Sequence, residues 1–345
     1  MLSNFDLPKI FGGKTIEQIE NIIARKADNV REITIPKRTG GKRKIIIPSG
    51  ELKYLQRAIN WQVLLKYRPS KYAHGFVHNR NIVSNANPHL ECKSIGHTDI
   101  KDFFDTIDSE HIKMSICGNM QICRMCKHYD EMVKGKCSIS LYANRKIKFA
   151  HRCEELKAIF VPDFCEKTGY KSLLKYVIEL STLNGKCVQG FPTSPHLANI
   201  VLRAFDMRVG AHAEQNGCLY TRYADDLTVS SKTHTANELR RTMRPAIMKN
   251  LFAFRFISKR EKEYYRDTGR KMICGVVVNK KTNIPRHQHL YFRSAVHHAT
   301  VIDKERTTKH DLNRLKGYAA YFMSINPERG RKYMNKLIEF EKSIA

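Results

Sequence analysis

Three aspartates of the sequence have the placement that a divalent metal site needs. Asp225 and Asp226 are adjacent in "YADD", between stretches in which apolar and polar residues alternate, and Asp99 falls where another predicted short strand stops. This alternation predicts half-buried strands with the Asp-Asp pair at a hairpin turn. One such pair alone is usually a surface turn, but three carboxylates brought together repel one another unless cations neutralise them. Oxygen ligands suit Mg²⁺, and two such ions can stabilise the attacking and leaving oxygens of a phosphoryl transfer.

The segments around these aspartates predict the elements that position them. Residues 94–107, "SIGHTDIKDFFDTI", form a short strand that ends at Asp99 and then enters a helix. The loop "GKCVQGFPTSPH", which begins at residue 185, is rich in glycine and proline. It leads into a helix for which Ser194 is the expected N-cap and Pro195 the first helical residue.

A predicted basic hairpin precedes these segments. Residues 31–48, "REITIPKRTGGKRKIIIP", contain two apolar strands around a Gly-Gly turn. The turn is either a solvated tip or a mobile finger that holds phosphates, because glycine permits close approach and Lys and Arg neutralise charge. Helices are predicted over residues 15–27 and 51–67, and a further hairpin over 271–285. The tail, 286–345, is helical in pattern and basic.

The composition points to an anionic partner. The 345 residues include 61 Lys and Arg but only 33 Asp and Glu, which gives a net charge of +28. Nucleic acid and an acidic membrane surface are the two partner classes that fit. No apolar run reaches the ~18 residues of a membrane span, and no signal peptide is recognisable at the N-terminus. We therefore expect a nucleic-acid-binding protein of the cytoplasm, without a membrane partner. There the ten cysteines would be thiols or metal ligands rather than disulfides.

Three motifs, in this order, resemble those of reverse transcriptases. "DIKDFF" at 99–104 is similar to the first aspartate motif, "QGFPTSP" at 189–195 to the QGxxxSP loop, and "YADD" at 223–226 to the catalytic hairpin. The resemblance covers roughly residues 31–290. It implies an α+β right-hand polymerase fold with fingers, a ferredoxin-like palm and a short helical thumb.

A narrower resemblance is to the retron-type bacterial reverse transcriptases. "NANPH" at 85–89 matches the NAxxH signature that this group carries before its first aspartate, and "YTRYADDLT" is typical of the group. The V-T-G triplet of the group is here Ile273-Cys274-Gly275, so the threonine credited with a nucleic-acid contact is replaced. The chain length leaves no room for maturase, endonuclease, integrase or RNase H domains, so we expect none.

The resemblance implies a role for individual residues. Asp99 and Asp225 are the expected principal Mg²⁺ ligands, and Asp226 is the weaker third. Phe104, five residues after Asp99, is the expected steric gate that excludes a 2′-hydroxyl. Gln189 and Gly190 are expected to line the nucleotide pocket. Arg43 corresponds to the fingers arginine that clamps the incoming triphosphate, which a planar guanidinium suits; Lys37 or Lys42 would assist it.

Two further assignments rest on the same resemblance. Lys259 and Lys262 both compete for the position of the lysine that serves as general acid for pyrophosphate in this family. Asn85 and His89 are expected RNA contacts through the NAxxH signature, the alternative being a plain loop of turn-forming residues.

A cysteine-rich insertion separates the first aspartate motif from the QG loop. Cys123 and Cys126 in "CRMC" have the spacing of half a zinc site, and Cys117 and Cys137 are the nearest thiols that would complete four ligands. Because no second CxxC exists, scattered buried thiols are the alternative. A structural Zn²⁺ would hold together a small subdomain without an apolar core of its own.

We expect three regions: an N-terminal helix and fingers over residues 1–90, a palm over 91–283, and a basic helical thumb over 284–345. The cysteine-rich insertion would belong to the fingers and extend from about 113 to 180.

The expected function is that of a retron RNA-directed DNA polymerase. By resemblance, it copies part of a cognate structured non-coding RNA into a small RNA-linked DNA from dNTPs, in antiphage defence, with a separate effector protein and host RNase H. The alternatives are a group II intron-like or other defence reverse transcriptase, and a non-catalytic RNA-binding protein that retains a polymerase shell. The intact Asp99, Asp225, Asp226 and Gln189 argue against the last of these.

Overall fold

The computed structural model describes residues 7–37, 40–116 and 168–344. The chain divides into two compact units, each assembled from separate segments. Unit 1 comprises Met1–Lys71, Lys101–Arg208 and Ala253–Ile257, and unit 2 comprises Tyr72–Ile100, Val209–Phe252 and Ser258–Ala345. The four cysteines proposed for zinc, Cys117, Cys123, Cys126 and Cys137, lie outside the described residues.

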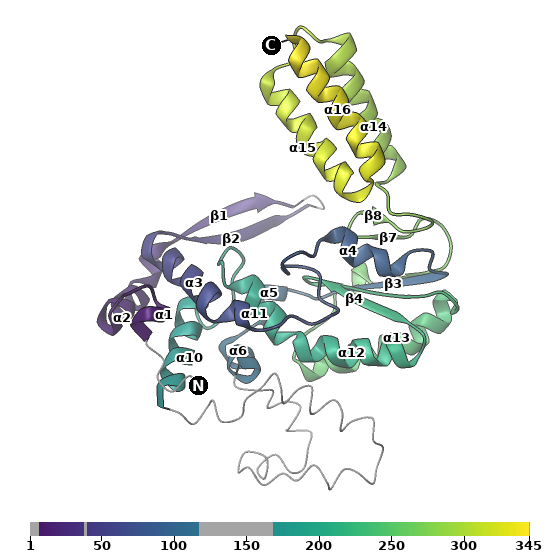
Figure 1. Ribbon diagram of the computed structural model, residues 1–345. Helices are drawn as coiled ribbons and strands as arrows, with labels where there is room; N and C mark the ends of the chain where they lie inside the picture. Colours follow the sequence, from purple (N-terminus) through teal and green to yellow (C-terminus); the bar gives the residue numbers. More distant parts are fainter. Residues whose placement is uncertain (1–6, 38–39, 117–167, 345) are drawn as a thin grey trace. The chain divides into compact units, whose positions relative to one another are not determined.

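The described part of unit 1 is mainly helical and contains an antiparallel hairpin (Figure 1). In the hairpin, Val30 pairs with Pro48 and Pro36 with Lys42, and the turn uses Gly40 and Gly41 with positive φ angles. This confirms the predicted hairpin, because only glycine adopts that backbone without strain. The described elements of unit 1 are α1 (Leu7–Ile10), α2 (Ile16–Ala24), η1 (Lys26–Asn29), β1 (Val30–Pro36), β2 (Lys42–Pro48), α3 (Gly50–Gln62), η2 (Leu64–Lys66), α5 (Phe103–Thr106), α6 (Ser109–Ile116), α10 (Thr168–Ser181) and α11 (Ser194–Val201).

The predicted start of α11 is wrong by one residue. Thr193 is the N-cap and Ser194 is the first helical residue, so Pro195 occupies the second position. The Ser194 hydroxyl donates instead to the Val188 carbonyl at 2.8 Å and thereby fastens the loop before the helix.

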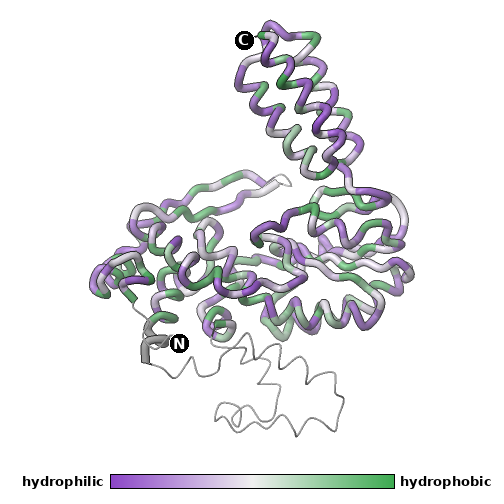
Figure 2. Tube along the Cα trace, viewed as in Figure 1, coloured by the Kyte–Doolittle hydropathy of each residue, from purple (hydrophilic) through white to green (hydrophobic). Residues whose placement is uncertain are grey.

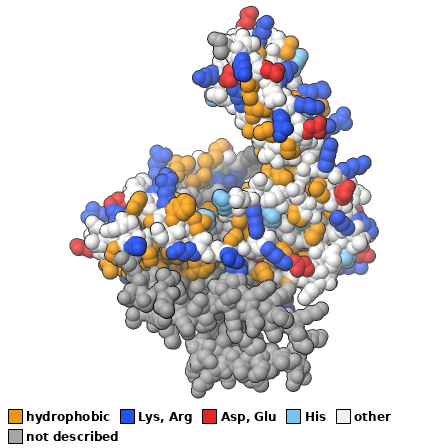
Figure 3. Space-filling model, viewed as in Figure 1, with side chains coloured by type: hydrophobic (Ala, Val, Ile, Leu, Met, Phe, Trp, Pro, Cys, Tyr) orange, Lys and Arg blue, Asp and Glu red, His pale blue; other side chains and the backbone are white. Residues whose placement is uncertain are grey.

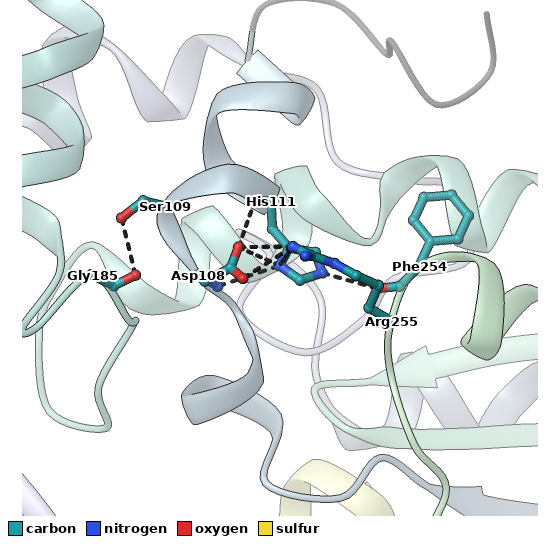
Figure 4. A network of polar contacts seen from close by, with 6 residues as sticks. All are labelled: Asp108, Ser109, His111, Gly185, Phe254 and Arg255. Atoms are coloured by element: carbon teal, nitrogen blue, oxygen red, sulfur yellow. Dashed lines mark hydrogen bonds and ion pairs between the residues drawn. The ribbon is translucent and has the colours of Figure 1, made fainter. Parts of the chain in front are cut away.

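A polar network holds α6 against the short segment 253–257 within unit 1 (Figure 4). The buried His111 ring lies between Asp108, 2.7 Å from Nδ1, and the Phe254 carbonyl, 2.9 Å from Nε2. Arg255 donates to both oxygens of Asp108 at 3.0 and 3.2 Å, although its own φ of 57° is left-handed. Burial alone would raise the pKa of Asp108, but hydrogen bonds from His111 and the Arg255 charge lower it overall. The network therefore stabilises a strained backbone position.

Unit 2 is built on a four-stranded antiparallel sheet with the order β4-β5-β3-β6. Strands β4 and β5 form the predicted hairpin around the Asp-Asp pair, and β7 and β8 form the other predicted hairpin. The mixture of helices with an antiparallel sheet confirms the α+β class. The elements are α4 (Ile82–Ala86), η3 (Asn87–His89), β3 (Ser94–Asp99), β4 (Leu219–Tyr223), β5 (Asp226–Ser231), α13 (Ala236–Ala253), η6 (Arg260–Lys262), β6 (Tyr264–Arg266), β7 (Met272–Ile273) and β8 (Val276–Val277), and α12 (Arg203–Gln215) connects unit 1 to unit 2.

The tail of unit 2 is helical, as predicted. It contains α14 (Arg286–His297), the π-helical turn η7 (His298–Ile302), α15 (Lys309–Ile325) and α16 (Pro327–Ile344). Figure 2 shows hydrophobic positions interspersed along these otherwise hydrophilic helices. Phe292, Phe322 and Leu337, one from each long helix, belong to a single buried cluster. Apolar residues at helical spacing thus give each helix one inward stripe. None of the described helices is long and apolar enough to cross a membrane.

Candidate active site

The sheet of unit 2 brings two of the three aspartates face to face. Asp99, the last residue of β3, is the register partner of Asp226, the first residue of β5. Asp225 lies in the turn between β4 and β5, where its carbonyl accepts a hydrogen bond from the Ile100 amide at 3.1 Å. The turn is tight because Ala224 has a left-handed φ of 57°. The three aspartates therefore lie together, as the sequence predicts.

The electrostatics of this cluster are those of crowded carboxylates. Burial, and then the charges of Asp99 and Asp226, raise the pKa of Asp225 to about 6. Burial and then Asp99 likewise raise the pKa of Asp226 to about 6. Asp99 is only 1% exposed. Like charges and desolvation both disfavour ionisation, so a cation at this site would be strongly favoured.

Two lysines approach the buried Asp99. The Lys262 ammonium donates to Asp99 Oδ2, and this hydrogen bond is the main cause of the raised pKa of Lys262. Lys259 Nζ lies 3.5 Å from Asp99 Oδ1. That contact neutralises charge, but its geometry is not that of a hydrogen bond, so Oδ1 is a buried oxygen without a donor. The sequence could not decide between Lys259 and Lys262, and the structure places both of them beside Asp99.

His97 is a site residue that the sequence analysis missed. Its Nε2 atom is 3.7 Å from Asp226 Oδ1, and its ring stacks on Tyr264 with centroids 5.3 Å apart. Potential ligand atoms of His97, Asp99 and Asp226 all lie within 4.8 Å of one another. Asp225, predicted as a principal ligand, is not a member of this group of three. The sequence position of His97 could have identified it, because it precedes Asp99 by two residues on the same strand and its side chain therefore points to the same face of the sheet.

The potential ligand atoms of this cluster fit a divalent cation. Carboxylate oxygens are the preferred ligands of Mg²⁺, and Asp99 Oδ1 is a buried acceptor that lacks a hydrogen-bond donor. The individual ligand roles of Asp99, Asp225 and Asp226 remain predictions.

The residues predicted to bind the nucleotide belong to unit 1. Gly190 has a φ of 117°, and a Cβ atom there would lie 2.2 Å from the Ile46 carbonyl oxygen. The Ile46 amide donates to the Gln189 carbonyl at 2.8 Å, so the QG loop is fastened to β2. Only glycine permits this close approach of two backbones.

Arg43 and Phe104, both in unit 1, differ in their exposure to solvent. Arg43 is on β2 opposite Ile35, and its side chain is exposed. Phe104 in α5 is half-buried, whereas its neighbour Phe103 is buried, with the two ring centroids 5.0 Å apart. Phe103 is thus the core residue of the pair. The nucleotide roles of Arg43, Phe104, Gln189 and Gly190 remain predictions.

Sequence comparison adds a family relationship to this geometry. The chain is 30% identical over 315 residues to the retron Mx65 reverse transcriptase and 28% identical over 327 residues to the retron Mx162 reverse transcriptase, both of Myxococcus xanthus. Each match covers 90% of this chain. The retron Ec86 reverse transcriptase of Escherichia coli is 24% identical over 96% of this chain and 87% of its own length.

The chain is a relative of the retron reverse transcriptases. This confirms the resemblance recognised in the motifs. The chain spans 65% and 61% of the lengths of the Mx65 and Mx162 proteins, which is less than two thirds of each. No protein-family model matches it. Among solved structures, a telomerase from Candida albicans in complex with a fragment of telomeric RNA has a TM-score of 0.46 and 11% sequence identity. The superposition covers 94% of this chain and 61% of the telomerase chain. That similarity is too weak to support a conclusion.

Asn85 and His89, the two residues matched to the NAxxH signature, are both buried. His89 is 0% exposed, with Nδ1 2.6 Å from the Ser230 hydroxyl and Nε2 2.8 Å from the Thr221 hydroxyl. Asn85 is also fully buried. Direct RNA contact, the predicted role of both side chains, is incompatible with this burial. His89 instead links η3 to β4 and β5 through its hydrogen bonds with Thr221 and Ser230.

Cys274, which replaces the threonine of the retron V-T-G triplet, lies beside the acidic cluster. Its Sγ atom is 3.8 Å from Asp226 Oδ2, and Asn85 Nδ2 is 3.6 Å from the same sulfur. Burial and the nearby Asp226 raise the pKa of the thiol to about 12, so it stays neutral. Asn85, Cys274 and Asp226 therefore form a chain of hydrogen bonds, in which the amide donates to the thiol and the thiol donates to the carboxylate.

Proposed function

We propose that this protein is an RNA-directed DNA polymerase of the retron type. The observation that carries the proposal is the register of β3 and β5, which sets Asp99 opposite Asp226 with Asp225 in the adjoining turn. This acidic cluster belongs to a chain of net charge +28, so an anionic substrate can be drawn to a site that itself requires cations.

The proposed reaction is attack by a primer hydroxyl on a deoxynucleoside triphosphate, with release of pyrophosphate. Asp99, Asp225 and Asp226 would hold two Mg²⁺ ions, which supply electrostatic stabilisation of the attacking and leaving oxygens. Lys259 and Lys262, whose ammonium groups lie at Asp99, are the available proton donors for pyrophosphate. In unit 1, Arg43 would bind the triphosphate, Gln189 and Gly190 would line the nucleotide pocket, and Phe104 would exclude a 2′-hydroxyl.

The proposed biological role extends the motif resemblance described in the sequence analysis. We propose that the protein copies part of a cognate structured non-coding RNA into a small DNA that stays linked to it, in the bacterial cytoplasm. Antiphage defence with a separate effector protein, and processing by host RNase H, belong to the same proposal. So does the division into fingers (1–90), palm (91–283) and thumb (284–345).

Primer extension tests the proposal. Purified protein with an RNA template, a DNA primer and dNTPs should synthesise DNA with Mg²⁺ and none with EDTA. Asp225→Asn should remove synthesis, whereas Glu305→Gln, an exposed carboxylate between η7 and α15, should not. RNA binding without synthesis at any Mg²⁺ concentration would favour a non-catalytic polymerase shell.

A further inference from the structure

Helix α3 presents an exposed aromatic stripe. Tyr54, Trp61 and Leu65 are 51%, 73% and 45% exposed, although all three are large and mostly apolar. Tyr54, Arg57 and Trp61 follow one another at intervals of three and four residues, which places them on one face of α3, and Leu65 follows in η2, beyond the end of that helix. We call Tyr54, Arg57, Trp61 and Leu65 the α3 stripe.

The opposite face of α3 is buried and hydrogen-bonded within unit 1, so the α3 stripe lies on the face of the helix that points away from that packing. Leu55 and Ile59 are completely buried. The Gln56 amide donates to the Leu180 carbonyl at 2.8 Å, and Asn60 donates to the Pro192 carbonyl at 2.9 Å. Rotation of α3 to hide its aromatic side chains would break these buried hydrogen bonds, each of which is costly to leave unmade.

The charge around the α3 stripe is of one sign. Between residues 52 and 68 there are four cations, Lys53, Arg57, Lys66 and Arg68, and no acid. Glu51, which precedes this span, is already paired with Lys14 at 2.6 Å. Figure 3 shows hydrophobic side chains gathered in the region of α3, with Lys and Arg side chains near them. A partner of the α3 stripe must therefore be anionic and must also offer flat apolar faces.

We infer that the α3 stripe binds a single-stranded segment of RNA. Nucleobases stack on aromatic rings while arginine and lysine neutralise the phosphates, which is how single strands are bound without sequence preference. The inference rests on the proposed function, in which a structured RNA is the substrate, and it assigns part of that RNA to a surface of unit 1, whereas the aspartate cluster belongs to unit 2.

The spacing within the α3 stripe favours a strand over a single nucleotide. Tyr54 and Trp61 are seven residues apart, or about 10 Å along a helix, so the two rings cannot enclose the same base. Arg57 lies between them in the sequence and on the same face. Two bases stacked on separate rings, with a phosphate at the arginine, match this order of side chains.

The sole tryptophan of the chain makes the test direct. Trp61 is the only tryptophan among 345 residues, so its fluorescence reports this surface alone. The probe is an oligouridylate of about twelve nucleotides, carrying a dye for a parallel anisotropy measurement. We expect the oligonucleotide to quench Trp61 as it binds, and salt to weaken that binding.

Three variants separate an RNA-binding surface from a merely structural one. Tyr54→Ala should weaken binding by about tenfold, the typical loss for one stacked base. Arg57→Gln should lower the slope of log affinity against log salt by about 0.7, as expected for one lost phosphate contact on a single strand. The control, Phe252→Ala, removes an aromatic side chain of α13 that is even more exposed, at 86%, and should change neither value.

Two results would overturn the inference. In one, anisotropy shows RNA bound while Trp61 fluorescence and the Tyr54→Ala affinity stay unchanged, which means that the RNA lies elsewhere. In the other, Trp61 responds to protein concentration without RNA, which means that a second protein molecule covers the α3 stripe. Primer extension by the parent protein keeps the proposed function separate, because that assay measures nucleotide incorporation, whereas the oligouridylate assay measures binding without dNTPs.

Discussion

Asp99 lies directly opposite Asp226 across the β3–β5 ladder, so their side chains are cross-strand neighbours with like charge. Like charges in this relationship destabilise a sheet. The sheet is thus less stable here than it could be, a condition that a bound cation relieves. Sites of function commonly carry such a cost.

Removal of a carboxylate from the acidic cluster should therefore stabilise the protein and remove its activity. Asp226→Asn removes one like charge and should raise the free energy of unfolding of the metal-free protein by about 1 kcal/mol. The same change should abolish DNA synthesis while RNA affinity, measured by anisotropy, stays the same. Urea unfolding with and without Mg²⁺ checks the stability, and Glu305→Gln is the neutral control. Full synthesis by Asp225→Asn with Asp226→Asn would refute the metal assignment.

Sugar selection should depend on Phe104 and not on Phe103. Phe104→Ala should increase the incorporation of ribonucleotides relative to deoxynucleotides, because a smaller side chain leaves room for a 2′-hydroxyl. Phe103→Ala should instead destabilise the protein by about 3 kcal/mol, since that ring is buried, and leave the ratio unchanged. Primer extension with mixed nucleotides measures the ratio. An unchanged ratio in Phe104→Ala would show that the gate lies elsewhere.

Gly190 should tolerate no side chain. Gly190→Ala would set a Cβ atom 2.2 Å from the Ile46 carbonyl oxygen at a φ of 117°, and we expect a loss of about 3 kcal/mol. Gly317→Ala is the matched control, because that glycine lies in α15 with open space around it and should gain about 1 kcal/mol. Thermal unfolding compares the two. Equal stability of the Gly190 variant and the parent would mean that β2 and the QG loop are not closely packed.

Acid should weaken unit 2 through His89. Burial lowers its pKa to about 3, against an ordinary value of 6.5, so the unfolded chain binds a proton over that range and the folded chain does not. Stability is therefore complete above pH 6.5 and falls as the pH drops toward 3, by about 2 kcal/mol at pH 5. His89→Gln should lower stability at pH 7 but flatten this dependence in urea unfolding. His310→Gln, exposed on α15, should retain it, and an unaltered slope in His89→Gln would exclude His89 as the cause.

The cysteine-rich segment should hold zinc apart from the polymerase chemistry. Elemental analysis of protein purified without chelator should find about one equivalent, as a closed four-ligand site requires. Cys123→Ser with Cys126→Ser should remove it and destabilise the segment, while Mg²⁺-dependent primer extension persists. Cys218→Ser, a buried free thiol of unit 2, should retain the metal. Less than about a tenth of an equivalent in the parent protein would identify ordinary thiols.

Local patterns in the sequence were enough to predict much of this structure. Alternation around Asp225 and Asp226 predicted the hairpin, and the Gly-Gly turn predicted β1 and β2. The part that could not be predicted depends on strand pairing over long separations. Lys262 reaches Asp99 from 163 residues away because β6 pairs with β3. The burial of His89 likewise requires β4 and β5, whose side chains supply its hydrogen-bond partners.

The lysines at Asp99 make metal loading an exchange rather than a simple addition. A divalent ion that binds Asp99 has to compete with the ammonium groups of Lys262 at Oδ2 and Lys259 near Oδ1, so the measured affinity is the difference between competing interactions. An ammonium group that leaves this carboxylate then needs another anion, and a triphosphate brings several. Metal and nucleotide should therefore assist each other's binding, so that neither saturates the site efficiently alone.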